Sequence, residues 1–154
     1  MLNENYIAPY YQKIANVLNS IVPVDWEDIV MYGEELGDIG SVGIYFKPVG
    51  EDKYHYGGMI PDEYGVDLNE YFERTDELLE LIKSLWIVFK DSEIQKWDTI
   101  TFKLNNQKKF NVKFGYKINR EISSLEREII WAYEELGIIP EDDFSKKVIE
   151  EYLA

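Results

Sequence analysis

The chain has 154 residues, of which 45% are hydrophobic and 15% aromatic, so it is long enough to bury the core of one domain. It contains no cysteine, which excludes disulfides, thiolate nucleophiles and zinc–thiolate sites. Thirty acidic and sixteen basic residues give a net charge of −14. Such a surface repels nucleic acid and anionic membranes and attracts basic proteins, although it also simply keeps a protein soluble.

The positive charge is concentrated in one short segment. Residues 96–120 hold 1 acidic and 7 basic residues, while residues 1–95 hold 19 and 6, and residues 121–154 hold 10 and 3. No run approaches the roughly 20 apolar residues of a membrane span, and the first residues lack the pattern of a secretion signal. We therefore expect a cytoplasmic protein without a membrane partner.

Apolar residues at helical spacing predict two long helices in the first two thirds of the chain. The first runs from about residue 4 to residue 22, and Pro23 ends it. Its expected buried face is Tyr10, Ile14, Val17, Leu18 and Ile21. The second spans residues 67–90, with Asp67 and Glu70 as a capping pair. Its expected apolar stripe is Leu68, Phe72, Leu79, Ile82, Trp86 and Phe89.

Alternating apolar residues predict the strands. Residues 24–47 read as a hairpin with turn residues at 37–41, and residues 54–56 read as a short third strand. Residues 60–66 read as a loop. Residues 98–117 form the clearest hairpin, with one apolar face and one basic face. The basic face consists of Lys103, Lys108, Lys109, Lys113 and Lys117.

A third helix has both of its ends marked in the sequence. Ser123 and Glu126 are spaced as a capping box, Gly137 suits a left-handed end, and Pro140 prevents continuation. The expected buried face is Leu125, Ile129, Tyr133 and Leu136. Residues 141–154 read as an exposed acidic start followed by a short terminal helix. The inward residues of that helix are expected to be Phe144, Val148, Ile149 and Tyr152.

The order of these elements predicts the fold class. Helices alternate with antiparallel hairpins, which favours an α+β fold whose sheet of four to five strands carries helices on one face. No linker or repeat divides the sequence, so we expect residues 1–154 to form one domain, with residues 144–154 as a possible helical extension. The strand order is not determined by the sequence.

No pattern in the sequence predicts a catalytic, cofactor or metal site. His55 is the only histidine and lies between two tyrosines, without a nearby serine or cysteine nucleophile to form a triad. Carboxylates are abundant, but residues 141–143 lack the spacing of a calcium loop. The basic hairpin is flanked by acidic segments, which disfavours binding of nucleic acid. Interface candidates among the aromatic residues are Tyr32, Tyr45, Tyr54 and Tyr64.

Eight short motifs, in order along about 120 residues, resemble the YezG-like antitoxin family of immunity proteins. They are Ile21-Val22-Pro23, Trp26-Glu27, Tyr45-Phe46-Lys47-Pro48, Ile60-Pro61, Tyr64-Gly65-Val66, Arg127-Glu128-Ile129-Ile130-Trp131, Leu136-Gly137-Ile138 and Pro140-Glu141-Asp142-Asp143. The resemblance implies a non-enzymatic partner of an LXG-type polymorphic toxin exported by type VII secretion in Gram-positive bacteria. It implies that the chain binds the toxin's C-terminal nuclease domain in the cytoplasm, without a cofactor.

The charge distribution is compatible with that role, because a nuclease channel is basic and an acidic partner can occupy it in place of phosphate. We expect local clusters of acids to make the contact. They are Glu34, Glu35 and Asp38 at the tip of the first hairpin, and Glu134, Glu135, Glu141, Asp142 and Asp143 around the end of the third helix. Two alternatives stay open: a carboxylate- or metal-dependent hydrolase, and an adaptor or chaperone for a secretion substrate. The identity of the toxin, its DNA or RNA target, and whether the chain forms homo-oligomers are not determined by the sequence.

Overall fold

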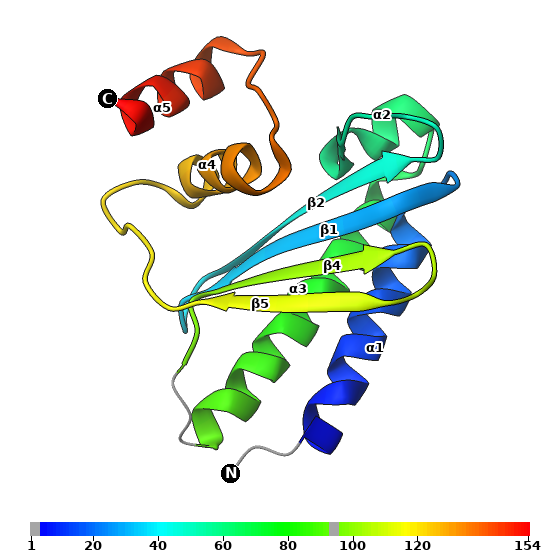
Figure 1. Ribbon diagram of the computed structural model, residues 1–154. Helices are drawn as coiled ribbons and strands as arrows, with labels where there is room; N and C mark the ends of the chain where they lie inside the picture. Colours follow the sequence, from blue (N-terminus) through cyan, green and yellow to red (C-terminus); the bar gives the residue numbers. More distant parts are fainter. Residues whose placement is uncertain (1–3, 93–95) are drawn as a thin grey trace. The chain divides into compact units, whose positions relative to one another are not determined.

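The fold is that of an α+β protein built on a five-stranded antiparallel sheet, as the sequence predicts. The structure is a computed structural model that describes residues 4–92 and 96–154. The strand order is β3-β2-β1-β4-β5 (Figure 1). The elements are α1 (Glu4–Ile21), β1 (Trp26–Glu35), β2 (Gly40–Pro48), β3 (His55–Tyr56), η1 (Gly57–Met59), α2 (Ile60–Tyr64), α3 (Leu68–Asp91), β4 (Thr99–Asn105), β5 (Phe110–Gly115), α4 (Ser124–Leu136) and α5 (Asp143–Leu153).

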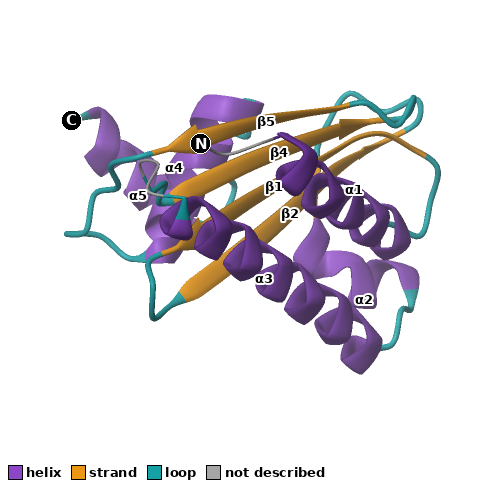
Figure 2. Cartoon of the chain, turned by 90° about the horizontal axis from the view of Figure 1, so that it is seen from below, coloured by secondary structure: helices purple, strands orange, loops and turns teal. Residues whose placement is uncertain are grey.

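Contacts divide the chain into two compact units, residues 1–116 and residues 117–154. The first unit holds the whole sheet, with α1 and α3 packed across one of its faces (Figure 2). The second unit holds α4 and α5, which contact each other. That all 154 residues act as one domain stays a prediction.

The core of the first unit lies between the sheet and its two long helices. Alternate residues of β1, β2 and β4 point toward the helices, because side chains on a strand alternate between its faces. Fully buried members include Ile14, Leu18, Ile29, Met31, Phe46, Leu78, Ile82, Leu85 and Phe102. Gly33 allows α3 to approach β1, since a Cβ at this position would lie 2.9 Å from Cδ1 of Ile82.

The buried face of α3 differs from the predicted stripe. Leu68 and Phe72 are 54% and 51% exposed, whereas Tyr71 is buried. Consecutive residues on a helix differ by about 100° in direction, so the true core face lies beside the predicted one. Leu78 and Leu85 complete the core face. The predicted cap at Asp67 is confirmed, because its side chain accepts a hydrogen bond from the Glu70 N–H over 3.0 Å.

The predicted loop at residues 60–66 is wrong over its first part. Residues Ile60–Tyr64 form the short helix α2, which has proline in its first turn and ends at Gly65 with a φ of 67°. Proline is compatible with the first turn of a helix, and glycine adopts the left-handed conformation that ends one. Pro61 and Gly65, which suggested a loop, therefore mark the start and the end of one short helix.

The second unit confirms the predicted helix ends. The Ser123 side chain accepts from the Glu126 N–H, the Glu126 side chain accepts from Ser123, and Gly137 ends α4 with a φ of 67°. The prediction that Leu125 is buried is wrong, because it lies in the first turn and is 55% exposed. In α5, Val148 and Ile149 are buried as predicted. The predictions for Phe144 and Tyr152 are wrong, because these end-of-helix residues are 53% and 45% exposed.

Candidate functional site

Two of the acids expected at the tip of the first hairpin are buried. Glu34 and Glu35 are 2% and 4% exposed, which contradicts the expectation that they form an acidic surface. The Tyr32 hydroxyl donates a hydrogen bond of 2.5 Å to Oε2 of Glu34. Both carboxylates lie near the end of β1, the central strand of the sheet, where neither face of the strand is open to solvent.

The Glu35 carboxylate ties the β1–β2 turn to helix α3. Its Oε2 atom accepts a hydrogen bond of 3.0 Å from the Gly37 N–H and lies 3.5 Å from Nζ of Lys83. The same ammonium group donates to the Gly37 carbonyl and lies over the Trp86 ring. Lys83 is far from the turn in the sequence, so local charge density gave no sign of this pairing. Asp38, the third expected acid of the tip, is exposed.

The remaining expected acids belong to the second unit. Glu134 is exposed and accepts a hydrogen bond of 2.6 Å from the Tyr152 hydroxyl, which links α4 to α5. This bond favours the protonated phenol and raises the pKa of Tyr152. Glu135 is half-buried. Of these two neighbours, Glu134 is therefore the more accessible to a partner.

Residues 141–143 form the exposed acidic segment that the sequence predicts. Asp142 has a structural role there as the N-cap of α5, since its Oδ1 atom accepts a hydrogen bond of 2.8 Å from the Ser145 N–H. Hydrogen bonds from Ser145 stabilise the carboxylate and lower the pKa of Asp142. Glu141 and Asp143 flank this cap, so a fixed helix end presents all three carboxylates.

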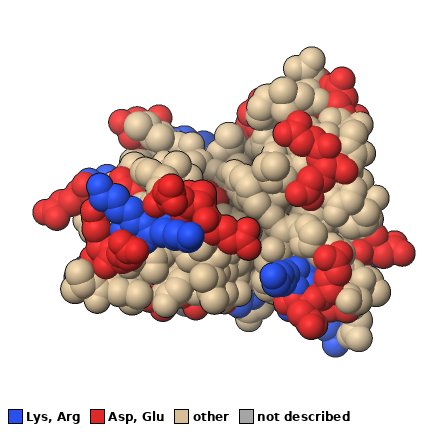
Figure 3. All heavy atoms as spheres, turned by 90° about the horizontal axis from the view of Figure 1, so that it is seen from above, with Lys and Arg blue, Asp and Glu red and all other residues tan. Residues whose placement is uncertain are grey.

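A further exposed acidic set follows one side of α3 in the first unit. Its exposed members are Glu73, Asp76, Glu77 and Glu80. Arg74 lies 3.6 Å from Glu77, a weak surface pair that leaves the set strongly negative. Figure 3, which shows the face seen from above, has several groups of acidic residues, in red, with basic residues, in blue, lying within some of them.

The tyrosines expected at an interface differ in exposure, and the single histidine has partners within the first unit. Tyr32 and Tyr45 are 4% and 7% exposed, so they are not available on the surface, whereas Tyr54 and Tyr64 are half-buried. His55 lies against the Phe46 ring, with Nε2 2.9 Å from Glu51. The partners of the single histidine therefore lie on β2 and in the loop that precedes β3.

The lysines of the second hairpin are mostly exposed. Lys108, Lys109 and Lys113 are exposed, and Lys103 is half-buried. Lys117, the fifth predicted member, is exposed in the second unit. Over residues 4–92 and 96–154, no group of three or more His, Asp or Glu side chains is arranged to hold a metal ion. No helix among the described residues is long and apolar enough to cross a membrane.

Fold and surface together define a small, strongly acidic α+β protein. A model of the immunity protein YezG-like family matches residues 7–150. Immunity protein YezG of Bacillus subtilis is 31% identical over 145 residues, which cover 93% of this chain and 96% of that protein. Immunity protein YezG of Bacillus spizizenii is 29% identical over 93% of this chain and 90% of that protein. Type VII secretion system protein EsaG of Staphylococcus aureus is 28% identical over 99% of this chain and 97% of that protein.

The chain therefore belongs to the YezG-like family of immunity proteins. The match extends from α1 into α5, so it includes both compact units. This confirms the family resemblance that the motifs indicate.

Proposed function

We propose that this protein is the cytoplasmic immunity protein of a secreted toxin, and that it binds and inhibits the toxin's C-terminal nuclease domain. The observation that carries the proposal is the family match over residues 7–150. The name of the S. aureus relative refers to type VII secretion, which favours that export route for the cognate toxin. In this role the chain acts by binding and needs no catalytic residue or cofactor of its own.

The acidic surface supplies a physical basis for binding a nuclease. A channel that holds phosphates is positively charged, and complementary carboxylates speed association and favour the correct partner. We propose the remaining members of the predicted set as contacts: Asp38, Glu134, Glu135, Glu141, Asp142 and Asp143. Glu34 and Glu35 are left out, because their burial makes them unsuitable for direct contact.

The test mixes the purified protein with the nuclease domain encoded beside it, and assays cleavage and co-elution at low and high salt. We expect a stoichiometric complex, inhibition of cleavage, and weaker inhibition as salt screens the carboxylates. Inhibition that is indifferent to salt would keep the immunity role and refute the acidic contact. No complex and no inhibition would refute the proposal for this pair.

A second arm compares folded and unfolded nuclease domain as the binding partner. An immunity protein of the proposed type binds the folded domain, because it acts on an assembled channel. Preference for the unfolded domain would instead indicate an adaptor that holds a secretion substrate open.

A further inference from the structure

An exposed ridge runs along the first half of α3, in the first unit. Residues four apart lie next to each other on a helix and form such ridges. This one consists of Leu68, Phe72, Asp76 and Glu80, and all four are exposed. Figure 2 shows α3 in front of the sheet, so the side of the helix that is turned away from the strands is open to view. The ridge begins apolar and ends acidic.

The apolar end of the ridge does not belong to the core of the first unit. Leu68 and Phe72 are 54% and 51% exposed, while the neighbouring Tyr71 is buried. The Phe72 ring meets the Tyr71 ring edge-on, with the ring centroids 6.2 Å apart. Single apolar residues on a surface are ordinary, and a helix face that is only solvated is polar. Two large apolar side chains on successive turns, bordered by charged groups, have instead the composition of an interface centre with its rim.

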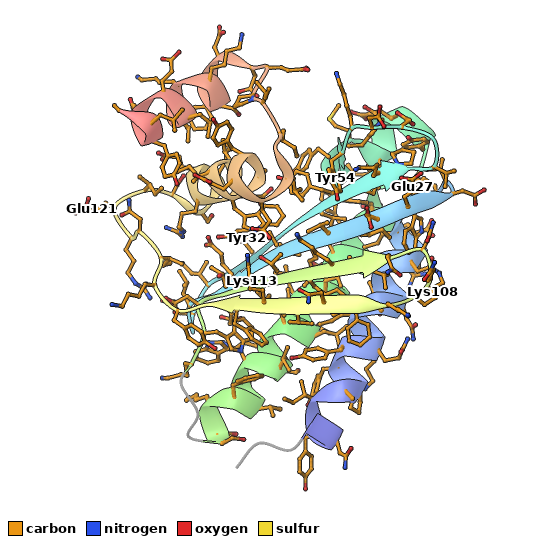
Figure 4. All side chains as sticks on the ribbon, in the orientation of Figure 1. Glu27, Tyr32, Tyr54, Lys108, Lys113 and Glu121 are labelled. Carbon is orange, nitrogen blue, oxygen red and sulfur yellow. The ribbon has the colours of Figure 1, made fainter. Side chains whose placement is uncertain are left out.

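The acidic end of the ridge has few cations near it. A second row of acids, Glu73 and Glu77, runs beside it, and all four acids are exposed. Among the described residues, no ion pair involves these acids other than that between Arg74 and Glu77, 3.6 Å apart. Lys113, which Figure 4 labels, projects from the face of the sheet opposite to the one that α3 covers, so it does not neutralise the ridge.

This arrangement of charges lowers the stability of the free protein. Asp76 and Glu80 are four residues apart, as are Glu73 and Glu77, and like charges at this spacing on a helix repel each other. The charges are not needed to hold α3 against the sheet, because the buried residues of α3 lie on another side of the helix. A partner that brings cations to the ridge removes this repulsion, so the charges favour the complex over the free protein.

We propose that this ridge docks the nuclease domain of the toxin, with Leu68 and Phe72 seated against an apolar spot on that domain and the two carboxylates against lysine or arginine side chains beside it. The inference rests on the proposed function and adds a contact on the first unit to it. A domain that binds phosphates carries the cations that the ridge lacks. A second copy of this chain is a poor partner, because it would bring two acidic ridges together.

A surface that is only solvated makes different predictions. In that case loss of Phe72 leaves affinity for the nuclease domain unchanged, and loss of the acids raises stability without any effect on binding. In the proposed role, removal of the same acids raises the melting temperature of the free protein and weakens the complex. The opposite signs of these two effects distinguish a docking surface from a structural one.

The first experiment measures the dissociation constant of the complex with the nuclease domain encoded beside this chain, by calorimetry, for variants of the full chain. Phe72→Ala removes the apolar centre of the ridge, and Tyr6→Ala removes an aromatic ring that is 67% exposed on α1. Both variants should stay folded by circular dichroism, because alanine is a good helix former. We expect Phe72→Ala to weaken binding roughly tenfold or more and Leu68→Ala several-fold, with Tyr6→Ala within about twofold.

A second pair of variants separates a local contact from the effect of net charge. Asp76→Asn with Glu80→Gln removes two charges from the ridge, and Asp52→Asn with Asp62→Asn removes two exposed charges elsewhere in the first unit. We expect the ridge variant to weaken binding several-fold at low salt and to raise the melting temperature by about 1 °C. The control should keep its affinity within about twofold.

Two outcomes overturn the proposal while the immunity role stands. One is that the variants of the ridge bind the nuclease domain as tightly as their controls do. The other is a dimer of the chain alone that Phe72→Ala abolishes, which assigns the ridge to a second copy. A wild-type chain that forms no complex at all would refute the proposed function for this pair, and the contact with it.

A fluorescent label gives an independent readout of docking. The chain has no cysteine, so Asn69→Cys places a single thiol on α3 one turn before Phe72. We expect a polarity-sensitive dye on this thiol to shift its emission to shorter wavelength when the complex forms. The same dye attached through Asp52→Cys should change little. Unchanged emission of the α3 label in a complex that has formed would contradict docking on the ridge.

Discussion

Two acidic segments of similar appearance in the sequence have opposite structural roles. Glu34 and Glu35 are the last two residues of β1 and are buried, whereas Glu141, Asp142 and Asp143 lie at the start of α5 and are exposed. The side chains of the first pair are buried, so their carboxylates must find partners inside the protein. The second group lies at the start of a helix, where the partial positive charge of the helix end stabilises carboxylates that stay in water.

The difference shows what a run of acids implies and what it does not. Charge density along the sequence predicts the net field of the protein, which depends little on local structure. It does not predict exposure, which depends on the strand pairing and on residues distant in the sequence. The buried Glu35 carboxylate, for example, lies 3.5 Å from Nζ of Lys83 on α3.

Among the substitutions that test this difference, we expect the largest effect on stability at Glu35. Glu35→Ala removes the acceptor of the Gly37 N–H and the carboxylate beside Lys83, whose ammonium group keeps only the Gly37 carbonyl at the turn. We therefore expect a loss of about 1–3 kcal/mol in the free energy of unfolding. Urea denaturation followed by circular dichroism measures it. Glu35→Gln keeps an oxygen that can accept from Gly37 and serves as the control, with a smaller loss expected. Equal stability of the Ala variant and the wild type would show that the buried carboxylate does not stabilise the packing of the β1–β2 turn against α3.

An intermediate effect is expected at the start of α4, which is fixed by an uncharged cap. Ser123→Ala removes the side-chain acceptor for the Glu126 N–H, and loss of an N-cap costs about 1 kcal/mol. The loss is measured by thermal denaturation of the full chain. Ser124→Ala, one residue further along and inside the helix, is the matched control, with little change expected. A loss as large in the control would mean that the capping box contributes nothing specific.

Features that depend on a few neighbouring residues could be predicted from the sequence. The ends of α4 were correct, because Ser123, Glu126 and Gly137 act on the same turns of backbone that they mark. The alternation of Ile100, Phe102 and Leu104 likewise gave the correct buried face of β4, since the period of a strand is fixed by its geometry.

Features that depend on tertiary packing could not be predicted in the same way. The apolar arc of α3 is wider than its buried face, so Phe72 looked like a core residue although Tyr71 occupies the core. The burial of Glu34 required knowledge that β1 is central, and the strand order was open. The Lys108 conformation had no sequence signal, because lysine is not a residue that favours a positive φ.

A smaller, pH-dependent effect is expected at Asp142. Its pKa in the folded state is lowered from 3.8, chiefly by hydrogen bonds from Ser145. The cap therefore stabilises the folded state at pH values above the unfolded pKa, and the contribution is lost as the pH falls through the lowered folded pKa. We expect the Ser145 amide resonance to shift in this acidic range. Asp142→Asn keeps a capping oxygen that does not titrate, so a similar shift in that variant would contradict the assignment to Asp142.

The smallest effect on stability is expected for the exposed acids next to that cap. Glu141→Ala with Asp143→Ala removes two solvated charges and no hydrogen bond within the described structure, so the free energy of unfolding should change by less than about 0.5 kcal/mol. The same double variant should lower the rate of association with the toxin domain at low salt, because rim charges act mainly on this rate. Stopped-flow mixing at two salt concentrations measures it. A large loss of stability would show that these acids are structural residues, as Glu35 is. An unchanged rate of association would remove them from the proposed contact, and the acids of α3 would be the next set to substitute.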